Sequence, residues 1–389
     1  MEIFGSDDLE QTRIEALKVL QEAKLQQDYY HLTQLYFVLG YIAENTDDFG
    51  NAIIYYLEGS RMGLLSDDVS VKSSVISMHK NLESILTDYK HYDLAKKFIK
   101  DGIELSYKYN NEKQIISLTN NLVYVYLQEE KYDEALSTID SLRSKFNLDQ
   151  DKIIQLKNKE GTAYLNLGDL EKAASCYQYI ISNDPGTDKE MYALSKHNLA
   201  LISIKKGKFE EAISFLEDVI RYSEEKKLNY RLFRALQELG QTYISLNETH
   251  LALEKFLKAE DIIKNSFTNN AETYSVYQLL STTYEMQGNI KMALHYKETY
   301  SEKLEEYIAK QEEITELDKK YNIQLLTDRY YDLLAADQEK KNTERIAKFG
   351  ISGTAFIFLS IVLMMMYRQR RMKQNLAREL YNIELTSDV

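Results

Sequence analysis

The sequence predicts an all-α protein in which about seven helical hairpins stack into a solenoid, followed by a long helix and a single transmembrane helix. Three observations lead to this prediction. The 389 residues include one Pro and 14 Gly, so the residues that interrupt helices or form tight turns are scarce. A pattern of about 40 residues recurs along most of the chain. Finally, residues 349–367 carry no charge.

The recurring pattern occupies residues 33–300. Each copy is an apolar helix face, a short polar turn and an amphipathic helix that opens with Ala. This Ala returns at intervals of 38 to 43 residues, at Ala52, Ala95, Ala135, Ala173, Ala212, Ala252 and Ala293. Because one hairpin cannot bury its own apolar face, we expect the copies to stack on one another.

Two further positions recur around each Ala. Twelve residues earlier stands a residue that is small or apolar in most copies: Gly40, Glu83, Val123, Gly161, Ala200, Gly240 and Ser281. Four residues later stands a large residue in most copies: Tyr56, Ile99, Ile139, Tyr177, Leu216, Phe256 and, as an exception, Lys297. We expect the small residues to mark the close crossing of the two helices, and the large ones to fill the space towards the next hairpin.

These copies resemble the tetratricopeptide repeat. The sixth copy carries the most complete pattern: Leu236, Leu239, Gly240, Tyr243, Ala252, Phe256 and Ala259. The only proline, Pro185, stands where a repeat of this family ends. The period is longer than the usual length of about 34 residues, as in longer-period relatives such as kinesin light chain. The resemblance implies a helical solenoid that binds proteins or peptides.

The resemblance also implies where a partner binds, because the first helix of each repeat lines the concave face. With each recurring Ala taken as position 20, positions 2, 5, 9 and 12 point into this groove, and the candidates are taken from positions 5 and 9. The candidate partner-binding residues are Lys80, Asn120, Tyr124, Asn158, Thr162, His197, Gln237, Gln241 and Gln278. Side-chain amides both donate and accept hydrogen bonds, so they suit the backbone of an extended peptide. The alternative is that these helix faces are polar only because they are exposed.

The segments that flank the repeats have their own predictions. Residues 1–32 contain either an unpaired leading helix or the second half of a truncated repeat. Residues 301–348 contain no Gly or Pro, and we predict one long helix there. It is either a solvated linker or a short coiled coil through which two chains form a homodimer.

The uncharged segment 349–367 is long enough to cross a bilayer, since about 20 helical residues span the hydrocarbon core. A buried core helix is the alternative. Four basic residues lie shortly before the segment and five after it, so the positive-inside rule favours a cytoplasmic tail over residues 368–389. The repeats would then be periplasmic. Without an export signal they would be cytoplasmic, and the N-terminus has neither the basic start nor the apolar stretch of such a signal.

Several kinds of chemistry are not expected. Phosphate-loop, dinucleotide, zinc-protease and nucleophile-elbow motifs are absent from the sequence. The six histidines are scattered, and the single cysteine, Cys176, fits a small buried residue. A net charge of −13 argues against nucleic-acid binding. We therefore expect no enzymatic activity, cofactor or metal.

Helical repeats, a charged helix, one span and a basic tail follow one another in this chain. This order resembles Bacteroidetes membrane-anchored tetratricopeptide sensor and regulator proteins. Those proteins carry an output domain that is not found after this tail, so the chain is expected to be either a fragment or the product of a trimmed gene model. The resemblance implies the sensory part of a bacterial signal-transduction or transcription-regulating receptor at the inner membrane. The alternative function is a static membrane-tethered scaffold that assembles protein partners without signalling.

Overall fold

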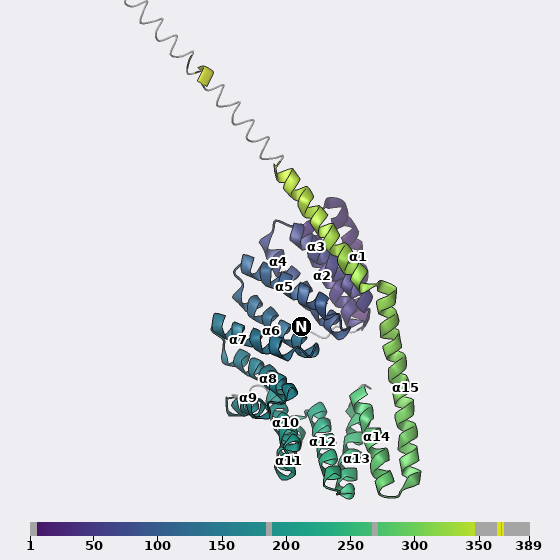
Figure 1. Cartoon of the computed structure of the whole chain (residues 1–389). Coiled ribbons are helices and arrows are strands. Elements are labelled where there is room, and N and C mark those ends of the chain that lie inside the picture. The colour runs from purple at the N-terminus through teal and green to yellow at the C-terminus, as the bar shows by residue number, and fades with distance from the viewer. Residues whose placement is uncertain (1–5, 184–188, 267–270, 347–363, 367, 369–389) are drawn as a thin grey trace, which may run out of the picture. The chain divides into compact units, whose positions relative to one another are not determined.

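The structure is a computed structural model, and it describes residues 6–183, 189–266, 271–346, 364–366 and 368. Within these residues every regular element is helical, as Figure 1 shows. The chain divides into two compact units, Met1–Leu326 and Thr327–Val389. The first unit contains the helices α1 (Ser6–Gln26), α2 (Tyr29–Asn45), α3 (Phe49–Leu65), η1 (Val69–Val71), α4 (Lys72–Asp88), α5 (Tyr92–Lys108), α6 (Glu112–Gln128), α7 (Tyr132–Lys145), α8 (Gln150–Leu167), α9 (Leu170–Asn183), α10 (Lys189–Lys205), α11 (Phe209–Lys226), α12 (Asn229–Ser245), α13 (Thr249–Ser266), α14 (Ala271–Met286) and α15 (Ile290–Tyr321).

The helices from α2 to α15 form the seven predicted hairpins, two helices to each repeat. The turn inside each hairpin contains one residue with positive φ, always five residues before the recurring Ala: Asp47, Lys90, Glu130, Gly168, Gly207, Asn247 and Gly288. The next backbone N–H then reaches back to a carbonyl of the first helix at 2.8–2.9 Å in all seven turns. This hydrogen bond satisfies a carbonyl that the helix end leaves open. Seven identical turns therefore give the hairpins the same geometry.

The two helices of a hairpin cross where the sequence predicts it. All seven recurring alanines are buried, and a Cβ added at Gly40 would lie 2.5 Å from the Tyr56 ring. At Gly161 the added Cβ would lie 2.8 Å from Cζ of Tyr177, and at Gly240 it would lie 2.8 Å from Cδ1 and Cζ of Phe256. The absence of a side chain on the first helix thus leaves room for an aromatic ring on the second.

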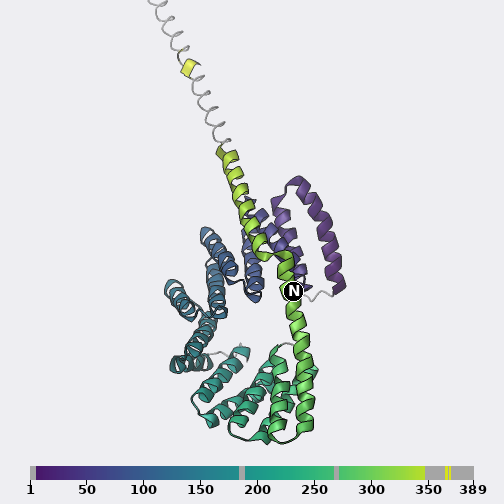
Figure 2. The same cartoon turned by 45° about the vertical axis from the view of Figure 1, so that its right-hand side comes forward.

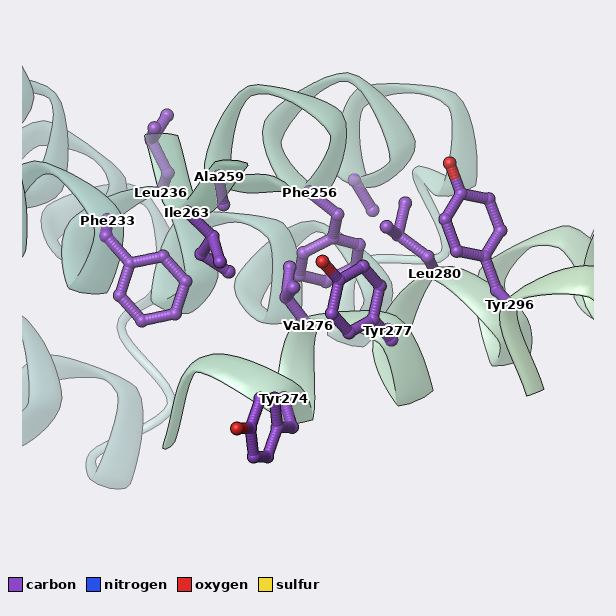
Figure 3. Close-up of a cluster of buried hydrophobic side chains, with 11 residues drawn as sticks. Phe233, Leu236, Phe256, Ala259, Ile263, Tyr274, Val276, Tyr277, Leu280 and Tyr296 are labelled. Atoms are coloured by element: carbon purple, nitrogen blue, oxygen red, sulfur yellow. The ribbon is translucent and has the colours of Figure 1, made fainter. Parts of the chain in front are cut away.

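The core continues from one repeat to the next. Figure 3 shows one cluster in which Phe233 and Leu236 of α12, Phe256 of α13, and Tyr277 of α14 pack together. The same cluster extends to Tyr296 of α15, which is stacked on Tyr277 with ring centroids 6.4 Å apart. In repeats one to six the second helix is thus covered by the first helix of the following repeat, as expected for a solenoid.

The leading segment contains a helix, as predicted, but its boundary differs. α1 ends at Gln26, and α2 already begins at Tyr29, so residue 33 lies inside the first repeat. Ala16, Leu20 and Ala23 of α1 are buried. Their spacing matches that of Ala252, Phe256 and Ala259 in α13. This match supports the second of the two interpretations, in which α1 is the second helix of an incomplete repeat.

The prediction of one continuous helix over residues 301–348 is wrong. Residue 301 lies inside α15, which begins at Ile290 as the second helix of repeat seven. This helix ends at Tyr321, where Asn322 has a φ of 44°, and a separate helix covers residues 323–346. The side chain of Asn322 accepts a hydrogen bond from the Leu325 N–H at 3.1 Å, which caps the new helix. Asn tolerates the left-handed conformation better than most residues, which explains the break.

Within the described residues, no helix is both long enough and apolar enough to span a membrane. The predicted span 349–367 lies outside these residues except for Met364–Met366. The tail 368–389 also lies outside them, apart from Arg368. Membrane crossing thus stays a prediction.

Candidate partner-binding face

The candidate residues belong to the first helices of repeats two to seven. Lys80 lies on α4, Asn120 and Tyr124 on α6, Asn158 and Thr162 on α8, His197 on α10, Gln237 and Gln241 on α12, and Gln278 on α14. They occupy equivalent places because each stands 15 or 11 residues before the buried recurring Ala of its repeat. The candidate face is defined here as positions 5 and 9 of these first helices. Its residues divide into an exposed group and a group that contacts neighbouring repeats.

Tyr124, Gln241 and Gln278 form the exposed group. The side chain of Tyr124 is 42% exposed, and both glutamines are classed with the exposed residues. Burial and the nearby carboxylates of Asp88 and Glu83 raise the pKa of Tyr124, so its hydroxyl is protonated at neutral pH and available as a donor. Gln241 and Gln278 can contact a partner without breaking a repeat interface, whereas the centroid of the Tyr124 ring also lies 5.9 Å from Nζ of Lys159 on α8.

The second group contacts neighbouring repeats. The Lys80 ammonium donates to Oγ of Ser117 on α6 at 3.2 Å. The amide of Gln237, which is 8% exposed, donates to Oγ of Ser275 on α14 at 2.6 Å. Oδ1 of Asn120 accepts from Nζ of Lys159 on α8 at 2.9 Å. These residues link adjacent first helices, so a change at any of them alters the stacking as well as the face.

His197 is also set apart from the exposed group, because it is 5% exposed. Burial, with smaller contributions from the positive charges of Arg234 and Arg231, lowers the pKa of His197 to about 3. The ring is thus neutral under ordinary conditions. Its place in α10 is that of a buried packing residue with polar atoms.

Asn158 and Thr162 lie between these two extremes. Both are half-buried, and the Thr162 hydroxyl donates to the Asn158 carbonyl at 3.0 Å within α8. Oδ1 of Asn158 is buried and has no hydrogen-bond partner in the structure. A buried acceptor without a partner costs about 1–3 kcal/mol, which makes Asn158 the member of the face with the most to gain from a donor.

A line of partly buried polar contacts joins the first three repeat interfaces, and sequence reasoning did not identify it. Asn81 donates to the Tyr56 hydroxyl at 2.8 Å, and that hydroxyl donates to Glu44 at 2.6 Å. Asn121 donates to Glu83 at 2.7 Å, and Lys159 donates to the Asn120 carbonyl at 2.5 Å. We call these contacts, with Asn120 Oδ1 included, the polar seam.

The charges in the polar seam are strongly affected by burial. Glu83 is 3% exposed, and burial raises its pKa despite the hydrogen bond from Asn121. Burial lowers the pKa of Lys159 to about 8, while the nearby Glu83 opposes the shift. The usable signal in the sequence was position 6, where Asn81, Asn121, Lys159 and Asn198 recur.

Sequence reasoning also missed Tyr41, which occupies position 9 of repeat one and is 41% exposed. The same counting that selected Tyr124 would have found it. Phe37, at position 5 of that repeat, packs near Tyr56 with ring centroids 6.3 Å apart. Exposed tyrosines therefore stand at position 9 in repeats one and three, and exposed amides follow in repeats six and seven.

The histidine, cysteine and acidic side chains are the residues that could hold a metal ion or act as nucleophiles. Among the residues that the structure describes, no group of three or more His, Cys, Asp or Glu side chains could hold a metal ion. Cys176 is 3% exposed, and burial raises its pKa to about 11, so its thiol is poorly reactive. Its predicted place as a small buried residue is confirmed.

Comparisons with known proteins agree with this geometry. Models of the tetratricopeptide repeat match residues 33–61 and 193–226, and a second such model matches residues 159–187. No curated protein matches the chain.

Solved structures of similar fold include the apo form of the quorum sensor NprR from B. thuringiensis. It is 17% identical with a TM-score of 0.57, over 76% of this chain and 86% of that one. A signal-transduction ATPase with a tetratricopeptide repeat sensor from Pyrococcus horikoshii is 16% identical with a TM-score of 0.52, over 79% of this chain and 50% of that one. The chain therefore carries tetratricopeptide repeats in an all-helical solenoid.

Proposed function

We propose that this chain is a non-catalytic, membrane-anchored module that binds proteins or extended peptides, as the sensory part of a bacterial signal-transduction or transcription-regulating receptor. The observation that carries the proposal is a set of exposed side chains at positions 9 and 5 of first helices. Tyr41, Tyr124 and Gln241 all stand at position 9 of first helices, and Gln278 stands at position 5. The fold also serves in a quorum sensor and in an ATPase sensor, and the proposal extends that use to this chain.

The chemistry of the face favours an extended partner. Amide side chains on the first helices of adjacent repeats can each bond a different peptide group of an extended segment, because each offers both a donor and an acceptor. Tyr side chains add flat apolar area and a hydroxyl at low cost in conformational entropy. The partner expected here is a segment whose apolar side chains contact Tyr41 and Tyr124 and whose backbone contacts Gln241 and Gln278.

The test for binding uses a library of random peptides displayed on phage and the full-length chain in mild detergent. We expect enriched sequences that lose affinity at least tenfold in the variant Tyr124→Ala/Gln241→Ala/Gln278→Ala. The matched control is Asp133→Ala/Glu210→Ala/His250→Ala, three exposed residues at position 18 of second helices. Equal affinity for the triple variant and the parent, with both folded, would rule out this face.

Membrane anchoring belongs to the same proposal. Residues 349–367 would form the single span, with the repeats in the periplasm and the tail 368–389 in the cytoplasm. Single cysteines placed at exposed Asp133 and in the tail can be probed with a membrane-impermeant maleimide in intact cells. Labelling at Asp133 but not in the tail is expected, and labelling only after lysis at both sites would contradict this topology.

A further inference from the structure

α15 is longer than the second helices of the other repeats. It has 32 residues, whereas those of repeats one to six have 14 to 18. At 1.5 Å per residue, α15 is about 48 Å long. Its beginning is the second helix of repeat seven, with Ala293 and Tyr296 buried. The remainder continues past the repeat and reaches the N-terminal helices, drawn in purple in Figures 1 and 2, where α15 contacts α3 of the first repeat.

The contact at that far end is between Tyr321 and Gly50. Gly50 is buried in the first turn of α3, and any Cβ added to it would overlap the Tyr321 ring. A helical glycine costs about 1 kcal/mol relative to alanine. Since the structure records no positive φ for Gly50, the ring provides the reason for a glycine here.

Equivalent positions in the other repeats support this reading. Gly50 occupies position 18, two residues before the recurring Ala. In repeats two to seven the same position is polar and exposed: Asp93, Asp133, Glu171, Glu210, His250 and Lys291. The one repeat that has a glycine at position 18 is thus the one on which an aromatic ring lies.

The chain changes direction immediately after this contact. Asn322 has a positive φ and caps the helix over residues 323–346. Ile323, the first residue of that helix, is 1% exposed. Buried residues therefore lie on both sides of this contact. Gly50 lies against the Tyr321 ring in space, and Ile323 follows Tyr321 by two residues in the chain.

We infer that α15 is a strap between the last and the first repeat, closed by a latch that consists of Tyr321 on Gly50. A solenoid of stacked hairpins can change its curvature by small rotations at each interface. With the latch closed, the distance from repeat one to repeat seven is set by a single helix. A change in curvature then opens the latch and releases the start of the helix 323–346. The inference does not rest on the proposed peptide binding.

The test measures the distance across the latch in the full-length chain. Spin labels are placed on cysteines introduced at exposed Asn45 and Leu325, in a Cys176→Ala background, and the distance distribution is recorded by pulsed electron paramagnetic resonance. The parent is expected to give one short, narrow distance. Gly50→Leu, which places a side chain where the ring lies, and Tyr321→Ala, which removes the ring, are expected to lose that peak in favour of longer distances.

The control is Asp93→Leu, the same kind of change at position 18 of repeat two, which is expected to keep the parent distribution. Far-UV circular dichroism establishes that each variant retains its helices. If Gly50→Leu fails to fold, Tyr321→Ala decides, because it leaves α3 unchanged. A broad distribution in the parent, or the parent peak retained in folded Tyr321→Ala, would overturn the latch.

Discussion

The crossing of α12 and α13 offers a direct test of how the repeats pack. Phe256 is completely buried, and a Cβ on Gly240 would lie 2.8 Å from two of its ring atoms. The substitution Gly240→Ala therefore forces either the ring or the helices to move. Overpacking costs about 1–3 kcal/mol, and the close approach of the new Cβ to the ring places this case in the upper half of that range, about 2–3 kcal/mol. The better helix propensity of Ala returns about 1 kcal/mol. We expect a net loss of about 1–2 kcal/mol in the free energy of unfolding.

The same chain supplies the compensating change. Repeat five has Ala200 and Leu216 at the positions of Gly240 and Phe256. The double variant Gly240→Ala/Phe256→Leu recreates that pair within repeat six. Phe256→Leu alone leaves a cavity and is expected to cost about 1–2 kcal/mol. In the double variant the new methyl group occupies part of that cavity, so the two losses should fall short of additive by about 1 kcal/mol.

Urea denaturation followed by circular dichroism at 222 nm measures all three variants and the parent. Gln241→Ala is the matched control. Gln241 follows Gly240 directly and its side chain is exposed, so this substitution should change the free energy of unfolding by less than about 0.5 kcal/mol. Two results would refute the reasoning. One is a Gly240→Ala variant as stable as the parent or more so, and the other is strict additivity in the double variant.

Three further predictions concern single residues. Burial lowers the pKa of His79 from 6.5 to about 4. Its contribution to folding stability is therefore complete above pH 6.5 and falls by about 3 kcal/mol as the pH is lowered towards 4. In His79→Leu the denaturation midpoint should depend less on pH across that window, and an unchanged pH dependence would contradict the assignment. Tyr56→Phe removes a hydroxyl with two hydrogen bonds and should cost about 1–2 kcal/mol, whereas exposed Tyr107→Phe should be neutral by the same assay. Gly168→Ala should cost about 1 kcal/mol, because the φ of Gly168 is 82°. Gly168→Asn should cost less, since Asn247 occupies the same turn position in repeat six. Equal thermal stability of the parent and both variants would contradict this.

The sequence was sufficient to predict the repeats because their physical requirements recur. A small residue at each crossing and a large one beyond it, as in Gly161 and Tyr177, mark a hairpin wherever they return at the same spacing. The turns were harder to read, because only three of the seven positive-φ residues are glycines. Lys297, which breaks the rule for large residues, stands on the last hairpin, where no further repeat covers α15.

The break at Asn322 was not predicted, because one asparagine in a helix-forming sequence is a weak signal until its φ is known. The candidate face was identified only in part for a similar reason. Counting positions located Tyr124 and Gln278 correctly on exposed surface, but it could not distinguish Gln237, whose amide bonds Ser275 of the next repeat. Position in a repeat predicts the direction of a side chain, while its partners depend on residues from other repeats.

The most direct test of the central claim, that the first-helix face binds a protein or peptide partner, is site-specific photo-crosslinking in cells. Benzoylphenylalanine is introduced singly at Tyr124 and Gln278 on that face, and at Asp133 and His250 on second helices, all four being exposed. The account predicts one shared crosslinked partner from Tyr124 and Gln278 and none of it from Asp133 or His250. Crosslinks to that partner from the second-helix positions alone would contradict the account.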